Sequence, residues 1–322
     1  MALLGGDSVL YRHLTKIEKE VLFMEKILIA TDSASDISEE IEKELGIKIL
    51  PFTIMIGDQS YISRKDFTPE GFYDLMAEHD EIPKTSQITP FEFQEFYLEA
   101  AKAGYTDVVL VLINSQGSST FANSLMAKDL FFEEYPEYEG KIHFYNYDGM
   151  GYSAQYGQPV IEAAKMVKEG KALKEILEYL TYELPRRKVY FGMYTLKYAG
   201  KSGRIPSAAA FVGDRLNLKP IMKIYHNQLV TGAKVRGEVK IIPRMVELTI
   251  ADMEPGTPYS IIYGNEPSAA KAAEELMRDI TGYGPEGYYP IGAAVAANAG
   301  PRTVGIAFHV KDEFENEGYK PQ

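Results

Sequence analysis

Hydroxyl and carboxylate side chains gather in four short segments of the chain, at residues 32–36, 84–89, 114–120 and 148–153. A neutral hydroxyl can donate a hydrogen bond to an anion, and a guanidinium adds charge-assisted hydrogen bonds. The side chains that fit this description are Thr85, Ser86, Ser118, Ser153 and Arg204. Because hydroxyls together with one guanidinium suit a carboxylate, the sequence first indicates a binding site for an organic acid.

Catalysis by a serine is the alternative use of these hydroxyls. The segment Gly151-Tyr152-Ser153-Ala154-Gln155 is close to the G-x-S-x-G turn of many hydrolases. Gln155 stands where that tight turn normally has a glycine, and a hydrolase also needs a base. Of the histidines that follow, His309 ends an apolar strand, where a structural role is expected. An acyl hydrolase that uses Ser118 or Ser153 stays open as the second interpretation, and we assign no catalytic residue.

Nucleotide and metal sites are less well supported. Gly200-Lys201-Ser202 looks like the end of a phosphate-binding loop, but that pattern requires a glycine where Thr195 stands. The five histidines contain no pair at the spacing of metal ligands. Asp32 and Asp36 suit either a hard cation or the capping of a helix N-terminus. We therefore expect no cofactor and no metal site.

The composition restricts the choice of partners. The 322 residues include 46 Asp and Glu against 34 Lys and Arg, which gives a formal net charge of -12. This surplus argues against nucleic acid, because phosphates require a basic face. The lack of cysteine excludes disulfides and thiolate chemistry and fits a cytoplasmic location. No apolar run approaches the roughly 18–20 residues of a membrane span.

Short apolar strands precede most of the polar segments, and helices follow them. We predict strands over residues 27–31, 47–56, 108–113 and 142–145. We predict helix starts near residues 38, 68, 89, 119 and 151, with a capping box in Thr89-Pro90-Phe91-Glu92. Alternating strands and helices predict a parallel sheet with helices on both faces, and such sheets bind ligands beyond the carboxyl ends of their strands.

The pattern changes after Pro185-Arg186-Arg187, which ends a helix predicted over 172–184. The elements predicted beyond it are strands over 189–194, 260–263 and 303–309, a hairpin over 220–235, and helices over 207–216 and 268–281. Such a mixture indicates an α+β domain. The fold class is therefore α/β, with an extension over 1–23, a Rossmann-like parallel-sheet domain over 24–186, and an α+β domain over 187–322.

Several of these segments also carry a resemblance to a known family. The chain resembles the DegV-like family of bacterial fatty-acid-binding proteins over roughly residues 24–308. The similar segments are Thr31–Asp36, Lys84–Gln87, Ser115–Thr120, Thr195–Ile205 and Lys219-Pro220-Ile221. Their order and spacing, rather than any one of them, make the resemblance specific.

The resemblance implies that a long-chain fatty acid lies between the two domains. Its tail is expected in an apolar tunnel of the N-terminal domain, and Thr85, Ser118 and Arg204 are expected to hold its carboxylate, with Ser86, Ser119, Ser153 and Asn298 nearby. A protein of this family does no chemistry alone. It presents the acid to a separate ATP-dependent fatty acid kinase subunit, which makes an acyl phosphate for phospholipid synthesis.

The chain departs from the family pattern near its end. Asn298 replaces a histidine expected at the headgroup, and asparagine donates a hydrogen bond but cannot become cationic. Arg302 replaces a glycine and adds a charge nearby. We interpret the chain as a non-catalytic carrier of a long-chain acyl carboxylate. The alternatives are the serine-dependent hydrolase and a binding protein for another small apolar acid.

Overall fold

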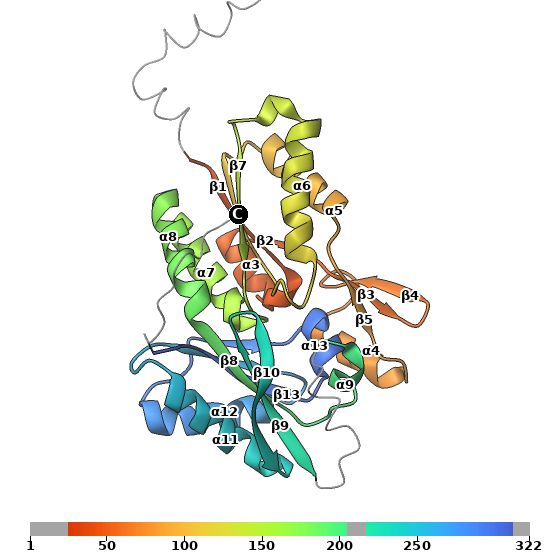
Figure 1. Ribbon diagram of the computed structural model, residues 1–322, viewed down its shortest axis with the longest axis vertical. Helices are drawn as coiled ribbons and strands as arrows, with labels where there is room; N and C mark the ends of the chain where they lie inside the picture. Colours follow the sequence, from red (N-terminus) through yellow and green to blue (C-terminus); the bar gives the residue numbers. More distant parts are fainter. Residues whose placement is uncertain (1–24, 205–216, 312–322) are drawn as a thin grey trace, which may run out of the picture.

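The computed structural model describes residues 25–204 and 217–311, which build two main sheets (Figure 1). In the first sheet every strand pair is parallel, and the strand order is β2-β1-β6-β7. The strands are β1 (Ile27–Asp32), β2 (Lys48–Leu50), β6 (Asp107–Leu112) and β7 (His143–Asp148). This arrangement confirms the prediction of a parallel N-terminal sheet.

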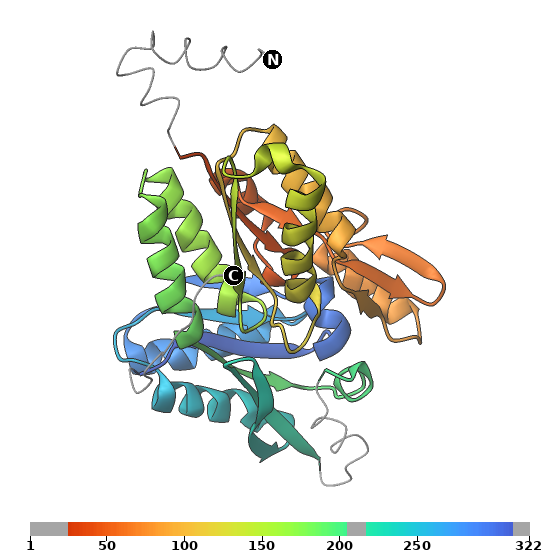
Figure 2. The ribbon, with the colours of Figure 1, turned by 45° about the horizontal axis from the view of Figure 1, so that its top comes forward.

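Helices cover both faces of this sheet, as predicted (Figure 2). Val108 and Leu110 of β6 point into a core shared with α5 (Pro90–Lys102) and α6 (Thr120–Glu134). The alternate residues Val109 and Val111 point into the core of the opposite face. That face is covered by α3 (Glu39–Leu45), α7 (Ala154–Lys168) and, outside it, α8 (Leu173–Glu183).

The second sheet is mixed, with the order β10-β9-β8-β13-β11-β12. Its strands are β8 (Arg187–Met193), β9 (Leu218–Tyr225), β10 (Gln228–Arg236), β11 (Tyr259–Tyr263), β12 (Gly287–Pro290) and β13 (Thr303–His309). Two helices, α11 (Ile241–Asp252) and α12 (Pro267–Thr281), pack on one face. The expected mixture of hairpin, strands and helices is confirmed, although α11 and β12 were not predicted.

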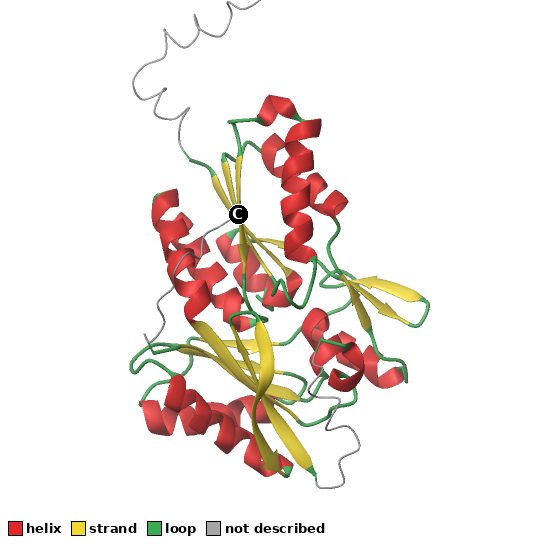
Figure 3. Cartoon of the chain, viewed as in Figure 1, coloured by secondary structure: helices red, strands yellow, loops and turns green. Residues whose placement is uncertain are grey.

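A small third sheet corrects two predictions (Figure 3). It contains β3 (Thr53–Ile56), β4 (Gln59–Ile62) and β5 (Lys84–Ser86), all antiparallel. The strand expected over 47–56 is in fact two strands that belong to different sheets. The break occurs because Pro51 has no N–H group to hydrogen-bond with a neighbouring strand. The N–H of Phe52 donates instead to the hydroxyls of Ser33 and Ser63. The segment 84–89 is accordingly not a loop at the carboxyl end of a parallel strand.

Helix α7 joins the two parts of the molecule, since it packs on β1 and β6 of one sheet and on β8, β11 and β13 of the other. The remaining α-helices of the described chain are α4 (Pro69–Glu78), α9 (Ala199–Ser202) and α13 (Ala293–Ala299). The expected extension over 1–23 and the expected helix over 207–216 lie outside the described residues. The division near residue 186 stays a prediction. None of the helices in the described ranges is long and apolar enough to cross a membrane.

Candidate functional site

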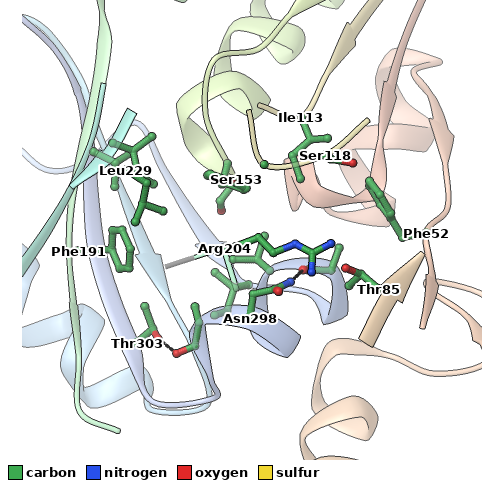
Figure 4. A pocket seen from close by; sticks show the side chains of 18 of the residues that line it. Phe52, Thr85, Ile113, Ser118, Ser153, Phe191, Arg204, Leu229, Asn298 and Thr303 are labelled. Carbon is green, nitrogen blue, oxygen red and sulfur yellow. Dashed lines mark hydrogen bonds between the residues drawn. The ribbon is translucent and has the colours of Figure 1, made fainter. Parts of the chain in front are cut away.

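A cavity of about 310 Å³ lies between the two main sheets (Figure 4). Its apolar wall comes mostly from the mixed sheet, through Val189, Phe191, Ile224, Leu229 and Ile262, with Phe52 and Ile113 opposite. Successive side chains of a strand point to opposite faces of the sheet. Val189 and Phe191 of β8 therefore face the cavity, while Tyr190 between them packs under α11. The cavity therefore lies where the resemblance places the carboxylate, and the apolar tunnel expected for the tail within the N-terminal domain stays a prediction.

The polar side of the cavity brings together residues that are far apart in the sequence. Six of the seven predicted ligand-binding residues line it, namely Thr85, Ser86, Ser118, Ser153, Arg204 and Asn298. Thr85 and Ser86 lie on β5, whereas Ser118 and Ser153 follow β6 and β7. Ser119 does not line it: this residue precedes α6, is exposed, and makes no capping hydrogen bond with its side chain.

The loop that carries Ser118 is shaped by Asn114 and Gly117. Asn114 Oδ1 accepts hydrogen bonds from the N–H groups of Gln116 (2.8 Å) and Gly117 (3.2 Å). The Ser118 hydroxyl lies 2.9 Å from that of Thr120. A Cβ atom on Gly117 would lie 1.9 Å from the Tyr152 hydroxyl, so only glycine allows this close approach. The loop therefore presents Ser118 on a backbone with little freedom.

The tip of the β9–β10 hairpin fastens the second sheet to the loops that follow β6 and β7. Asn227 Nδ2 donates to Asp148 Oδ2 (2.8 Å), and Asn114 Nδ2 donates to the Asn227 carbonyl oxygen (3.2 Å). Asp148 Oδ1 accepts from the N–H groups of Ser115 (3.1 Å) and Met150 (2.9 Å). One carboxylate thus holds two site loops and the hairpin together.

Arg204 follows α9 and Gly203, which ends that helix in the left-handed conformation with φ of 74°. The Arg204 side chain is exposed, and its Nη1 donates to the Ser202 carbonyl oxygen (3.0 Å). Figure 4 shows its guanidinium in the middle of the polar side, below Ser153 and beside Thr85. Arg204 is therefore a cation at the mouth of the cavity.

Asn298 and Arg302 differ in their relation to the cavity. Asn298 lines it from α13, and its Nδ2 donates to the Ala294 carbonyl oxygen (3.1 Å). Arg302 is not among the lining residues, because its guanidinium pairs with Glu266 (2.5 Å) and Glu238 (3.2 Å). The charge that Arg302 was expected to add nearby is therefore paired with two carboxylates, and its effect on the headgroup stays a prediction.

The turn after β1 holds two buried carboxyl groups. Asp32 accepts hydrogen bonds from the Tyr156 hydroxyl (2.6 Å), Ile113 N–H (2.7 Å) and Ala34 N–H (2.9 Å), which confirms its capping interpretation. Burial raises the pKa of Asp32 to about 6. Asp36 Oδ1 accepts from Gly292 N–H (2.8 Å) just before α13, and burial raises the pKa of Asp36 to about 7. Within residues 25–204 and 217–311 no group of three or more acidic, histidine or cysteine side chains is placed to hold a metal ion.

Sequence reasoning missed Tyr152 and the apolar wall. Tyr152 lines the cavity beside Ser153, and burial raises its pKa to about 12, against the opposing effect of Arg204. The wall residues could have been found only in part. The sequence shows that successive side chains of β8 point to opposite faces of the mixed sheet. It does not show which of these faces meets the first sheet, because that is fixed by the packing of α7 and by the hydrogen bonds of the hairpin tip.

Known proteins were compared with this chain, which has a parallel sheet, a mixed sheet and a cavity between them. A sequence model described as "Uncharacterised protein, DegV family" matches residues 26–311. The chain belongs to the DegV family. It is 31% identical over 297 residues to a DegV domain-containing protein of Caldanaerobacter subterraneus subsp. tengcongensis, covering 89% of this chain and 100% of that one. The resemblance stated from the sequence is thereby confirmed.

Two solved DegV structures share both the fold and a quarter or more of the aligned residues. The DegV protein of Bacillus subtilis, described as a fatty acid binding protein, is 27% identical, with a TM-score of 0.76 over 89% of this chain and 100% of that chain. A DegV family protein of Thermus thermophilus, described by its fatty acid binding, is 25% identical, with a TM-score of 0.76 over 88% and 100%. Fatty acid binding is thus a described property of DegV proteins similar to this one.

Proposed function

We propose that this protein binds a long-chain fatty acid in the cavity between its two sheets. The observation that carries the proposal is a single cavity with hydroxyls and a guanidinium on one side and an apolar wall on the other. Thr85, Ser118 and Arg204 hold the carboxylate, and Ser86, Ser153 and Asn298 lie around it. The fatty acid binding described for similar DegV proteins supports the same ligand.

The physical chemistry of the cavity suits such a ligand. Transfer of each methylene from water to an apolar environment contributes about 0.8 kcal/mol, so a long chain gains several kcal/mol along the wall of Phe191, Ile224 and Leu229. Charge-assisted hydrogen bonds from Arg204 and the hydroxyls fix the anionic end. The acid is then held by its tail and oriented by its headgroup, with that headgroup near the exposed Arg204.

The orientation supports a carrier function. An acid whose carboxylate lies at the mouth of the cavity can be presented to a second protein, and we propose an ATP-dependent fatty acid kinase subunit as that partner. The kinase makes the acyl phosphate for lipid synthesis, and this chain takes no part in the phosphoryl transfer. A cytoplasmic location, where ATP is present, follows from this proposal.

Organic extraction followed by mass spectrometry tests the binding function. We expect the purified protein to carry a fatty acid, and the delipidated protein to take up palmitate in isothermal titration calorimetry. Arg204→Gln should weaken palmitate binding, whereas Arg278→Gln, a surface control on α12, should not. A delipidated protein that takes up no fatty acid between about 10 and about 20 carbons, a range that buries several kcal/mol of methylene groups, would refute the proposal.

A further inference from the structure

Tyr152 lies in the turn between β7 and α7, and this turn is tied to the loop that carries Ser118. The N–H of Asn114 donates to the Gly151 carbonyl oxygen (3.1 Å), while Oδ1 of the same asparagine shapes the Ser118 loop. Within the turn, Gln155 N–H donates to the Tyr152 carbonyl oxygen (3.2 Å). The backbones of Tyr152 and Ser118 are therefore fixed relative to each other.

The residue after Tyr152 holds the turn from its other side. Ser153 has a φ of 54° and a ψ of -137°, a backbone conformation that residues other than glycine rarely adopt. Such a conformation persists only where the surroundings impose it, and here Ser153 N–H donates to the Ala34 carbonyl oxygen (2.8 Å). The fold thus sets the direction in which the Tyr152 side chain leaves the backbone.

The Tyr152 side chain reaches the polar side of the cavity beside Ser118. It lines the cavity, and its hydroxyl oxygen lies close to Gly117, where an added Cβ atom would be only 1.9 Å from that oxygen. Ser118 directly follows this glycine, and Arg204 lines the same side of the cavity (Figure 4). We therefore expect a carboxylate held by Ser118 and Arg204 to lie within reach of the Tyr152 hydroxyl.

The Tyr152 hydroxyl has no partner within the described part of the chain. Other interior tyrosines around the first sheet donate to protein oxygens: Tyr97 to the Ser124 carbonyl oxygen (3.1 Å) and Tyr156 to Asp32 (2.6 Å). Polar groups in a protein interior normally have such partners, so a hydroxyl that faces a cavity without one needs an explanation. A ligand oxygen in the cavity would supply the missing acceptor.

The Tyr152 hydroxyl keeps its proton at neutral pH and is therefore a hydrogen-bond donor. Burial raises the pKa of Tyr152 to about 12, Arg204 opposes that rise, and Asp148 adds to it. A hydrogen bond from a neutral hydroxyl to a carboxylate is stronger than one to an uncharged oxygen. The position of Tyr152 thus favours an anionic headgroup over an uncharged one.

We propose that the Tyr152 hydroxyl donates a hydrogen bond to the carboxylate of the bound fatty acid and selects the ionised acid over acyl ligands with an uncharged headgroup. The inference rests on the proposed function, because it requires the cavity to hold a fatty acid. Ser118 approaches the carboxylate from the loop after β6, Arg204 from the segment after α9, and Tyr152 from the turn after β7. Because these three donors come from separate segments, they fix the orientation of the headgroup as well as its place.

Binding of two ligands to the delipidated full chain tests this inference. Palmitate and hexadecanol have chains of the same length, but only palmitate carries a charge. Tyr152→Phe removes the hydroxyl and keeps the ring, so the packing beside Gly117 is retained. Tyr182→Phe, at an exposed tyrosine on α8, removes the same group away from this cavity and is the matched control. Calorimetry gives the affinity of each variant for each ligand.

Tyr152→Phe should weaken palmitate binding roughly 10- to 100-fold, as expected for the loss of a hydrogen bond to a charged group. Hexadecanol binding should weaken less, so the ratio of the two affinities should fall roughly 5- to 10-fold, whereas Tyr182→Phe should leave both affinities unchanged. Equal losses for both ligands would assign the hydroxyl to the shape of the cavity and overturn this inference alone. An unchanged palmitate affinity in Tyr152→Phe would do the same. A parent protein that binds no palmitate would overturn the proposed function as well.

Discussion

Replacing Asp36 by asparagine should make the protein more stable at alkaline pH. The folded chain buries this carboxyl group, so it holds the proton more tightly than the unfolded chain does, and its pKa rises from 3.8 to about 7. Stability contributed by the protonated form is therefore complete below pH about 4 and is lost as the pH rises to about 7. Asparagine does not titrate and carries no such loss.

The size of the effect follows from the pKa shift. One pKa unit corresponds to 1.36 kcal/mol, so the rise from 3.8 to about 7 represents on the order of 4 kcal/mol at pH 8. In the Asp36→Asn variant the amide oxygen can still accept from Gly292 N–H, but the new NH₂ group must find an acceptor near Ser153, and a failure costs about 1–3 kcal/mol. We expect a net gain of about 1–3 kcal/mol at pH 8. At pH 5 the penalty in the parent is only about 1.6 kcal/mol, so the gain should vanish or become a small loss.

Urea unfolding of the delipidated protein between pH 4 and pH 9 measures this difference directly. Asp129→Asn, on the exposed face of α6, is the control, and its stability should follow that of the parent at every pH. The reasoning is refuted if the difference between Asp36→Asn and the parent does not grow between pH 4 and pH 7. That outcome would show that Asp36 ionises without cost and is not held in an apolar environment.

Three further predictions concern the ligand. Ser118→Ala should weaken palmitate binding roughly 10- to 100-fold in calorimetry, because a hydrogen bond to a charged group contributes about 1.5–3 kcal/mol; an unchanged affinity would place the carboxylate elsewhere. Asn298→His should tighten binding below pH about 7 relative to the parent, since a histidine beside a carboxylate becomes cationic; superimposable pH curves would show that residue 298 does not contact the headgroup. Arg302→Ala should change palmitate affinity less than about twofold, because the Arg302 guanidinium pairs with Glu238 and Glu266 at a partly exposed site; a tenfold loss would place its charge in the binding site.

The local chemistry of the chain predicted much of the first sheet and its loops. The capping box at Thr89 and Glu92 forms as expected, and α5 begins there. The polar loops after β6 and β7 were predicted because apolar strands followed by hydroxyl-rich segments are typical of parallel sheets. These signals are contained within a few consecutive residues, so a single sequence suffices to find them.

The rest depends on contacts between distant segments. A three-residue strand such as β5 exists because it pairs with β3, and the sequence of Lys84-Thr85-Ser86 contains no separate signal for it. Helix α13 consists mostly of alanines, and from the sequence these suggested only a small apolar surface. The hydrogen bond from Gly292 N–H to Asp36, which holds the N-terminus of this helix, could not be predicted, because its two partners are 256 positions apart.

If the cavity holds a fatty acid as we propose, the hairpin tip should affect how that acid leaves. Leu229 of β10 belongs to the apolar wall, while Asn227, two residues earlier, is hydrogen-bonded to the loops that lead to Ser118 and Ser153. A hairpin movement that uncovers the tail therefore also pulls on the headgroup loops. Release of the tail and release of the carboxylate then become one concerted event with one rate constant. Exchange of a fluorescent fatty acid for palmitate should accordingly follow a single exponential, and the protein would hold its cargo with a lifetime set by the hairpin rather than by chain length alone.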